Sequence, residues 1–190
     1  MKIKVFMTVV CAIVLVGVCL AQAPKGNGRS NTQIIDFILN FQEKRLVDVA
    51  EAMPAEKYEF APTASEFKGV RTFGEQLKHI AADNYLLGAG ILGEKPPVDS
   101  GMSERGSAAV KTKPEIIAYL TDSFAYMRRA AAAIDEEKTA IPTPEISPWP
   151  GDTATRLGVA IEDCVHTWDH YGQLVEYLRM NGIVPPASRR

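Results

Sequence analysis

Two helix-start signals constrain the fold of this 190-residue chain more than any other feature of the sequence. Thr72 is followed three residues later by Glu75, and Thr112 is followed in the same way by Glu115. In each pair the hydroxyl and the carboxylate can accept hydrogen bonds from backbone N–H groups that the start of a helix leaves without partners. The two signals therefore predict two helices, each beginning directly after its threonine.

Apolar residues at helical spacing extend these signals to four predicted helices. Clusters of proline, glycine and serine separate the segments and predict long connections. No segment shows the alternation of β-branched residues that is typical of a strand. The predicted helices span residues 33–53, residues 73–92, about 113–137, and a last segment that is capped by Asp152 or Thr153 and continues to about 181, where Gly182 ends it. The fold class is therefore all-α, and we expect a four-helix bundle with long inter-helix loops.

Residues 1–23 have the composition of a secretory signal peptide. Lys2 and Lys4 precede an almost wholly apolar stretch, and Ala21 to Ala23 provides small residues at the spacing that a signal peptidase recognises. The alternative is a membrane anchor, because the apolar stretch reaches the minimum spanning length of about 17 residues. No charged cluster follows the stretch, which favours cleavage. We expect residues 24–30 to form a flexible leader and residues 31–190 to form the bundle of an exported protein, periplasmic or secreted, without stable membrane contact.

The cysteines and the net charge restrict the function further. Cys11 and Cys19 lie in the predicted signal, so the exported chain keeps only Cys164 and forms no internal disulfide. Val18 is bulky for a lipoprotein site, and we do not expect a lipid anchor at Cys19. Cys164 is expected to pack as a small apolar residue, the alternative being a nucleophile beside His166. The net charge of −2 and the lack of a long basic run argue against a nucleic-acid partner.

All three histidines of the chain lie in predicted helices. His166 and His170 are four residues apart, so both imidazoles lie on one helical face and can reach one metal ion. His79 lies in a different helix, and bundles build metal sites from side chains on facing helices. Three imidazoles would leave an open position for water or substrate, as catalytic sites do. The alternative is a partly buried imidazole cluster that neighbouring carboxylates satisfy.

Four carboxylates lie within about one helical turn of these histidines. Each of them could orient an imidazole as a hydrogen-bond acceptor, or could be an ordinary solvated charge on a helix. They are Glu75 and Asp83 around His79, and Glu162 and Asp169 around His166. The sequence singles out none of them as a base, and it leaves the catalytic residues unassigned.

Three segments together resemble the DinB-like (DinB/YfiT) metalloenzyme family. They are Tyr58-x-Phe60-x-Pro62, FGEQLKHIA at residues 73–81, and HTWDHYGQLVEYLRMNGIVPP at residues 166–186. The resemblance covers about residues 30–186, and the spacing of the three histidines is its most specific part. It implies a four-helix bundle with an up-down-down-up course and a divalent metal ion, zinc or nickel, held by His79, His166 and His170. Members of the family are often dimeric, and the best-understood ones are transferases or isomerases that use low-molecular-weight thiols.

These observations lead to three functional hypotheses. The first is an exported metal-dependent hydrolase or thiol-dependent transferase that acts on a small molecule through the three-histidine site. The second is a non-catalytic four-helix module that binds a metal ion or a small ligand. The third is a purely structural bundle that associates with itself. The sequence indicates neither the substrate nor the oligomeric state, and a homodimer is suggested by the family resemblance alone.

Overall fold

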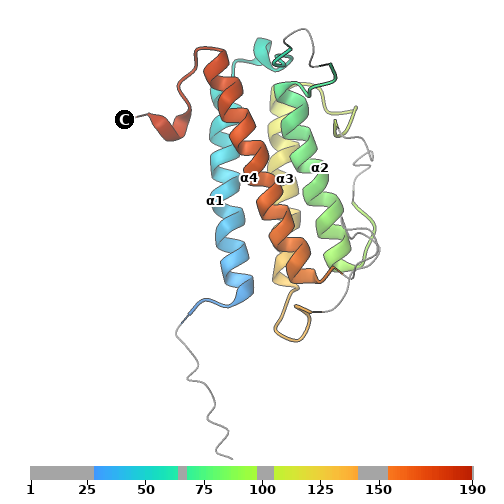
Figure 1. Ribbon diagram of the computed structural model, residues 1–190. Coiled ribbons are helices and arrows are strands. Elements are labelled where there is room, and N and C mark those ends of the chain that lie inside the picture. Colours follow the sequence, from blue (N-terminus) through green and yellow to red (C-terminus); the bar gives the residue numbers. More distant parts are fainter. Residues whose placement is uncertain (1–27, 64–67, 98–104, 141–153, 190) are drawn as a thin grey trace, which may run out of the picture.

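The computed structural model describes residues 28–63, 68–97, 105–140 and 154–189 of the chain (Figure 1). Within these ranges the chain forms four long helices and no strands, which confirms the all-α prediction. The predicted signal peptide, most of the leader and the predicted cap at Asp152 or Thr153 lie outside the described residues. The elements are α1 (Asn31–Ala52), the 3-10 helix η1 (Ala55–Lys57), α2 (Phe73–Leu92), α3 (Lys113–Ala132), α4 (Arg156–Met180) and the 3-10 helix η3 (Pro186–Ser188).

Side-chain caps fix where the helices begin. Thr72 with Glu75 and Thr112 with Glu115 form the two predicted capping boxes at the starts of α2 and α3. A third capping box opens α1, where Ser30 and Gln33 play the same parts. The α4 helix begins after Thr155, whose hydroxyl accepts a hydrogen bond from the Gly158 N–H at 3.0 Å. All four long helices therefore start at a hydroxyl side chain that satisfies a backbone N–H group.

The α3 helix ends earlier than the sequence predicts. The expected end was about Glu137, whereas the last helical residue is Ala132. Beyond it the backbone turns, and Asp135 accepts a hydrogen bond from the Lys138 N–H with its side chain at 2.8 Å. This local bond gives the backbone an alternative to the helix, and the charged residues that follow have no apolar face to bury. At α4, Gly182 adopts a positive φ of 72° and ends the helix as predicted.

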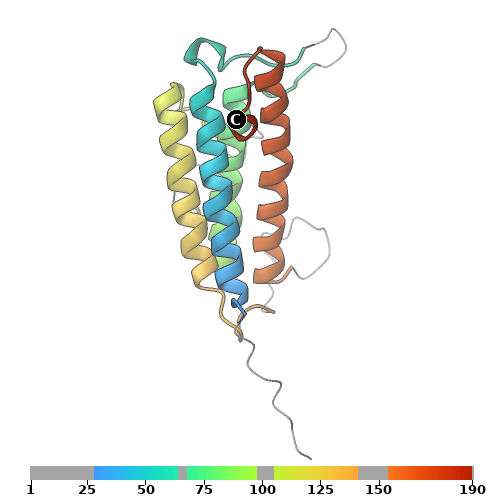
Figure 2. The same cartoon turned by 90° about the vertical axis from the view of Figure 1, so that its left-hand side faces the viewer.

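The four helices follow an up-down-down-up course (Figures 1 and 2). The α1 and α4 helices run in one direction, and α2 and α3 run in the other. Each helix packs on two others, because α1 and α2 each contact both α3 and α4. Because α2 and α3 run in the same direction, the end of α2 and the start of α3 lie at opposite ends of the bundle, and a long connection has to join them. The topology implied by the family resemblance is therefore present.

The apolar faces of the four helices meet in one core. Leu39, Leu77, Leu120 and Leu174, one from each helix, are all fully buried. One end of the bundle is covered by the segment after α1. Tyr58 is buried there with its ring centroid 5.2 Å from that of Phe73, and its hydroxyl donates to the Ala50 carbonyl at 2.8 Å. This cover fixes the start of α2 against the end of α1.

Exposed apolar side chains are concentrated on two helices, α1 and α4. We call this group of side chains the α1–α4 apolar face. Six of the seven large apolar side chains that are exposed in the described part of the chain belong to α1 or α4. They are Ile34, Phe37 and Phe41 on α1, and Ile161, Val165 and Met180 on α4. No helix among the described residues is both long and apolar enough to span a membrane.

A tight contact holds the loop before α3 against α2. Gly106 has a positive φ of 69°, and a Cβ atom at this position would lie 2.6 Å from backbone atoms of Lys78. The Lys78 ammonium donates to the Ser107 carbonyl at 3.2 Å and secures the same loop. The contact also places Arg105, the residue before the glycine, next to Glu75 at the start of α2.

We expect Gly106→Ala to destabilise the fold more than Gly93→Ala does. Both glycines have positive φ, and an alanine in that conformation costs about 1 kcal/mol. Only at Gly106 would the new Cβ also collide with neighbouring backbone, since nothing lies within 4 Å of the Cβ position at Gly93. Chemical denaturation followed by circular dichroism should show a loss of unfolding free energy for Gly106→Ala that exceeds the loss for Gly93→Ala by about 1–3 kcal/mol. Equal losses would contradict the close packing of this loop.

Candidate metal centre

The structure brings the three predicted ligands together between α2 and α4. His79 lies in the second turn of α2, and His166 and His170 lie in the middle of α4. The Nε2 atom of His166 is 3.1 Å from Nε2 of His79 and 2.9 Å from Nε2 of His170. One ligand atom from each ring lies within 4.8 Å of the other two. The three imidazoles could therefore hold a single metal ion.

The spacing of the nitrogen atoms fits one ion better than it fits a hydrogen-bonded cluster. For zinc–nitrogen bonds of about 2.0–2.1 Å, donors at right angles lie about 2.9 Å apart and donors at the tetrahedral angle lie about 3.4 Å apart. The two Nε2 separations, 3.1 and 2.9 Å, fall in this range. A ring nitrogen carries either one proton or one lone pair. His166 Nε2 therefore cannot form good hydrogen bonds to both of the other Nε2 atoms, whereas one ion can bind all three.

Asp83 adds a carboxylate oxygen to the same cluster. Its Oδ2 atom lies 3.4 Å from Nε2 of His79 and 3.2 Å from Nε2 of His166. An acceptor that only orients an imidazole would lie behind the ring, at the nitrogen that does not bind the metal. Asp83 instead lies on the side where the Nε2 atoms converge. Its oxygen is therefore placed as a fourth donor or as a hydrogen-bond acceptor for a group bound there.

The other three carboxylates that the sequence offered occupy different positions. Glu75 accepts a hydrogen bond from the Thr72 N–H at 2.8 Å and pairs with Arg105. Asp169 accepts a hydrogen bond from the Gln173 amide at 2.7 Å. Glu162 lies on α4 next to Asp163 and helps to raise the pKa of that buried carboxyl. Of the four, Asp83 is the one that the structure places against the Nε2 atoms.

The surroundings favour the neutral form of two of the three imidazoles, those of His79 and His166. Burial, with a contribution from the positive charge of Arg71 and from the other imidazoles, lowers the pKa of His79 to about 3. Burial, followed by His170 and Arg71, lowers the pKa of His166 to about 4. A neutral imidazole has the free lone pair that a metal ion requires. His79 and His166 are therefore held in the form that binds a cation.

Two adjacent residues of α4 near the histidines, Asp163 and Cys164, have raised pKa values. Asp163 is fully buried, and burial followed by the charges of Asp83 and Glu162 raises its pKa to about 8. This carboxyl is therefore mainly protonated at neutral pH. Burial and Asp163 raise the pKa of Cys164 to about 12, so its thiol is not an activated nucleophile. Cys164 is the small buried residue that the sequence predicts.

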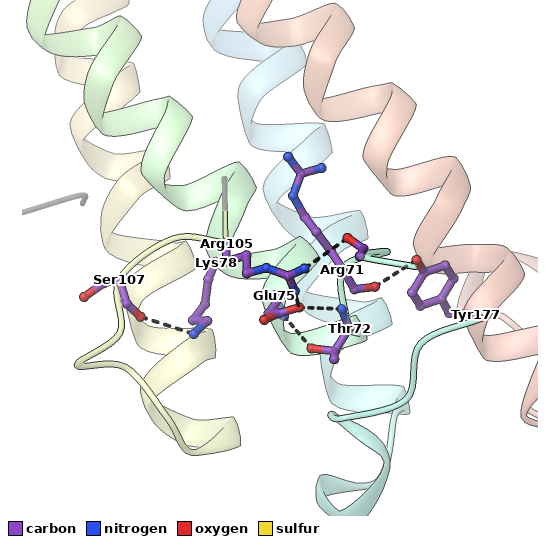
Figure 3. A network of polar contacts seen from close by, with 8 residues as sticks. Arg71, Thr72, Glu75, Lys78, Arg105, Ser107 and Tyr177 are labelled. Carbon is purple, nitrogen blue, oxygen red and sulfur yellow. Dashed lines mark hydrogen bonds and ion pairs between the residues drawn. The ribbon is translucent and has the colours of Figure 1, made fainter. Parts of the chain in front are cut away.

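A set of polar contacts, partly drawn in Figure 3, fixes α2 against α4 at the end of the bundle nearest the site. The Tyr177 hydroxyl of α4 donates to the Arg71 carbonyl just before α2, at 3.1 Å. The Gln76 amide of α2 donates to Gln173 Oε1 of α4 at 2.5 Å. Sequence reasoning missed Arg71, Gln76 and Gln173. The only available signal was that each glutamine lies three residues from a histidine.

Comparisons with known proteins place the chain in a family. A crystal structure of a conserved protein from Enterococcus faecalis has a similar fold, with a TM-score of 0.64 and 16% sequence identity over 80% of this chain and 97% of that chain. At this identity the likeness concerns the fold alone. No curated protein matches the chain. The sequence pattern of the DinB superfamily matches residues 38–174, a range that contains the three histidines and Asp83, and the chain therefore belongs to the DinB superfamily.

Proposed function

We propose that the protein binds one divalent metal ion through His79, His166 and His170, with Asp83 as a further oxygen donor. The observation that carries this proposal is the convergence of three imidazole nitrogens and one carboxylate oxygen from two facing helices. Zinc and nickel are the ions we favour, because imidazole suits both of them. The lowered pKa values of His79 and His166, which favour their neutral forms, support the same conclusion.

We further propose that the protein is exported and uses this ion in hydrolysis or thiol transfer on a small molecule. When bound, such an ion lowers the pKa of a coordinated water or thiol and so supplies a nucleophile at neutral pH. His79, His166 and His170 would hold the ion with uncharged ligands, so only the Asp83 carboxylate would offset part of its positive charge. Asp83 lies close enough to the Nε2 atoms to accept a proton or a hydrogen bond from a group at the remaining position.

The second candidate is a non-catalytic module that binds a metal ion or a small ligand with the same residues. A panel of ester, amide and thiol-transfer substrates offered to metal-loaded and metal-free protein separates the two candidates. Turnover that requires the metal supports the enzyme. Tight metal binding without turnover on any member of the panel supports the binding module.

We expect tag-free protein to bind about one zinc or nickel ion per chain and His79→Ala to lose most of it. The substitution removes the only donor from α2 among the three imidazoles, and the remaining pair on α4 binds a divalent ion much less tightly. Elemental analysis after metal loading and desalting gives the ratio. Wild-type protein without stoichiometric metal under these conditions would contradict the proposal.

We expect Asp83→Ala to weaken metal binding by about tenfold or more, because the oxygen near the Nε2 atoms is lost. Competition with a chromophoric chelator measures the affinity. Asp169→Ala is the matched control, since that carboxylate lies near the site but bonds to Gln173. If the two variants bind metal equally well, Asp83 is not a donor.

We infer that the homodimer expected from the family packs through the α1–α4 apolar face. The exposed large apolar side chains of the described chain are concentrated on these two helices, and a second copy would bury the same face on both partners. Val165→Glu should convert a dimer into a monomer in light scattering. Ala125→Glu, which adds the same charge to the exposed side of α3, should leave the dimer intact. A monomeric wild-type protein, or a dimeric Val165→Glu variant, would exclude this interface.

A further inference from the structure

Five buried polar side chains outside the metal centre form a group that we call the core polar layer. Each of the four long helices contributes at least one of them, and none is more than 1% exposed. They are Gln42 of α1, Asn84 of α2, Ser123 of α3, and Asp163 and Thr167 of α4. Side chains of these types are mostly exposed in proteins, and a bundle core needs only apolar residues. The proposed function gives the layer no role.

Hydrogen bonds between helices show that members of the layer lie near one another. The Gln42 amide of α1 donates to the Cys164 carbonyl of α4 at 2.6 Å, directly beside Asp163. The Asn84 amide of α2 donates to the Ser123 hydroxyl of α3 at 3.0 Å. The layer therefore consists of two bonded contacts, one between α1 and α4 and one between α2 and α3.

The alignment of α2 with α4 places these two contacts at the same level of the bundle. The two helices are antiparallel, and a hydrogen bond joins them near each end. One joins Gln76 to Gln173 at 2.5 Å, and the other joins the Arg156 side chain to the Ile91 carbonyl at 2.7 Å. Midway between these bonds, Asn84 of α2 is level with the part of α4 that belongs to the layer.

Asp163 lies at the centre of this arrangement. The α4 helix packs on both α1 and α2, so its core-facing side chains lie between those two helices. Asp163 is level with Gln42 on one side and with Asn84 on the other. Thr167 follows it by four residues and lies on the same face of α4, one helical turn away.

Five oxygen atoms of the layer have no hydrogen-bond partner within the described part of the chain. They are Gln42 Oε1, Asn84 Oδ1, both carboxyl oxygens of Asp163, and Thr167 Oγ1. Because the amide nitrogens of the two longer side chains donate to other atoms, their oxygens remain as acceptors. A buried polar atom without a partner is costly, and proteins retain few of them. Five such atoms at one level indicate that a bound polar molecule satisfies several of them together.

Asp163 has the strongest need for such a molecule. It is fully buried, and neither of its oxygens is bonded. A protonated carboxyl group has a proton to donate and an oxygen that accepts, whereas an ionised one only accepts. In both states the group leaves bonds unmade here. A molecule that donates and accepts would satisfy the carboxyl group together with the amide oxygens of Gln42 and Asn84.

Water fits these requirements better than a cation does. A buried water molecule makes about three hydrogen bonds to polar groups that would otherwise lack partners. Asp163 is the one titratable group of the layer, and burial followed by Asp83 and Glu162 raises its pKa to about 8. The carboxyl group therefore keeps its proton for the most part at neutral pH, and a metal ion requires the deprotonated form.

We propose that the core polar layer is a binding site for ordered internal water, which bridges Asp163 of α4 to the amide oxygens of Gln42 in α1 and Asn84 in α2. The water would join α4 to both of its neighbours inside the core. Asp163 precedes His166 by three residues, so the same turn of α4 carries the water site and a metal ligand. The water site does not require the metal, and metal-free protein should contain it.

High-resolution crystal structures of metal-free wild type and two variants provide the first part of the test. We expect a water peak within hydrogen-bond distance of the Asp163 side chain and of the Gln42 or Asn84 oxygen. Asp163→Asn keeps the shape of the side chain and its ability to form hydrogen bonds, and should keep the peak. Asp163→Val is similar in size but forms no side-chain hydrogen bond, and should lose it.

Oxygen-17 relaxation dispersion, which counts long-lived internal water molecules, provides the second part in solution. We expect Asp163→Val to hold about one such molecule fewer than the wild type. Leu174→Met is the matched control, since it changes a fully buried side chain of α4 outside the layer and should leave the count unchanged. If Asp163→Val does not fold, Gln42→Met, which removes the acceptor on α1, takes its place with the same expected loss.

Three results would overturn the proposal. The first is a wild-type crystal without a water peak in the layer, for example with Asp163 bonded directly to Gln42 or Asn84. The second is a water count that is the same in the wild type and in the variant. The third is a higher melting temperature in sodium chloride than in choline chloride at equal ionic strength, for the wild type but not for Asp163→Asn. That result would identify the bound species as a cation.

Discussion

Three imidazole nitrogens lie close together between two antiparallel helices, α2 and α4. Much of the surrounding structure depends on this arrangement. Without a cation, the nitrogen of His166 would face two others with only one proton or lone pair to share. Burial makes protonation of His79 and His166 unfavourable, so a positive charge on these two rings cannot take the place of a cation. The cluster is therefore best explained as a set of ligands, and the nearby oxygen of Asp83 fits the same explanation.

The rest of the bundle keeps α2 and α4 in the register that this arrangement needs. The capping box at Thr72 sets where α2 begins, and the Tyr177 hydroxyl ties that start to α4. On the opposite side of α2, the loop at Gly106 packs so closely that only glycine fits.

The local signals in the sequence were sufficient for the fold, and less so for the site. Capping boxes and apolar spacing predicted the four helices, and they failed mainly at the end of α3, where the side chain of Asp135 favours a turn. The three histidines could be singled out because their spacing and scarcity are visible in the sequence. The choice of Asp83 over the other carboxylates could not be made, because it depends on how the two helices face each other. Arg71 was missed for the same reason.

Anomalous diffraction from crystals of the metal-loaded protein tests the central claim most directly. The account predicts one strong anomalous peak between α2 and α4, about 2.0–2.1 Å from the Nε2 atoms of His79, His166 and His170. The Asp83 carboxylate should face the same peak. A peak bound to fewer than three of these nitrogens, or a peak elsewhere on the protein with this site empty, would contradict it.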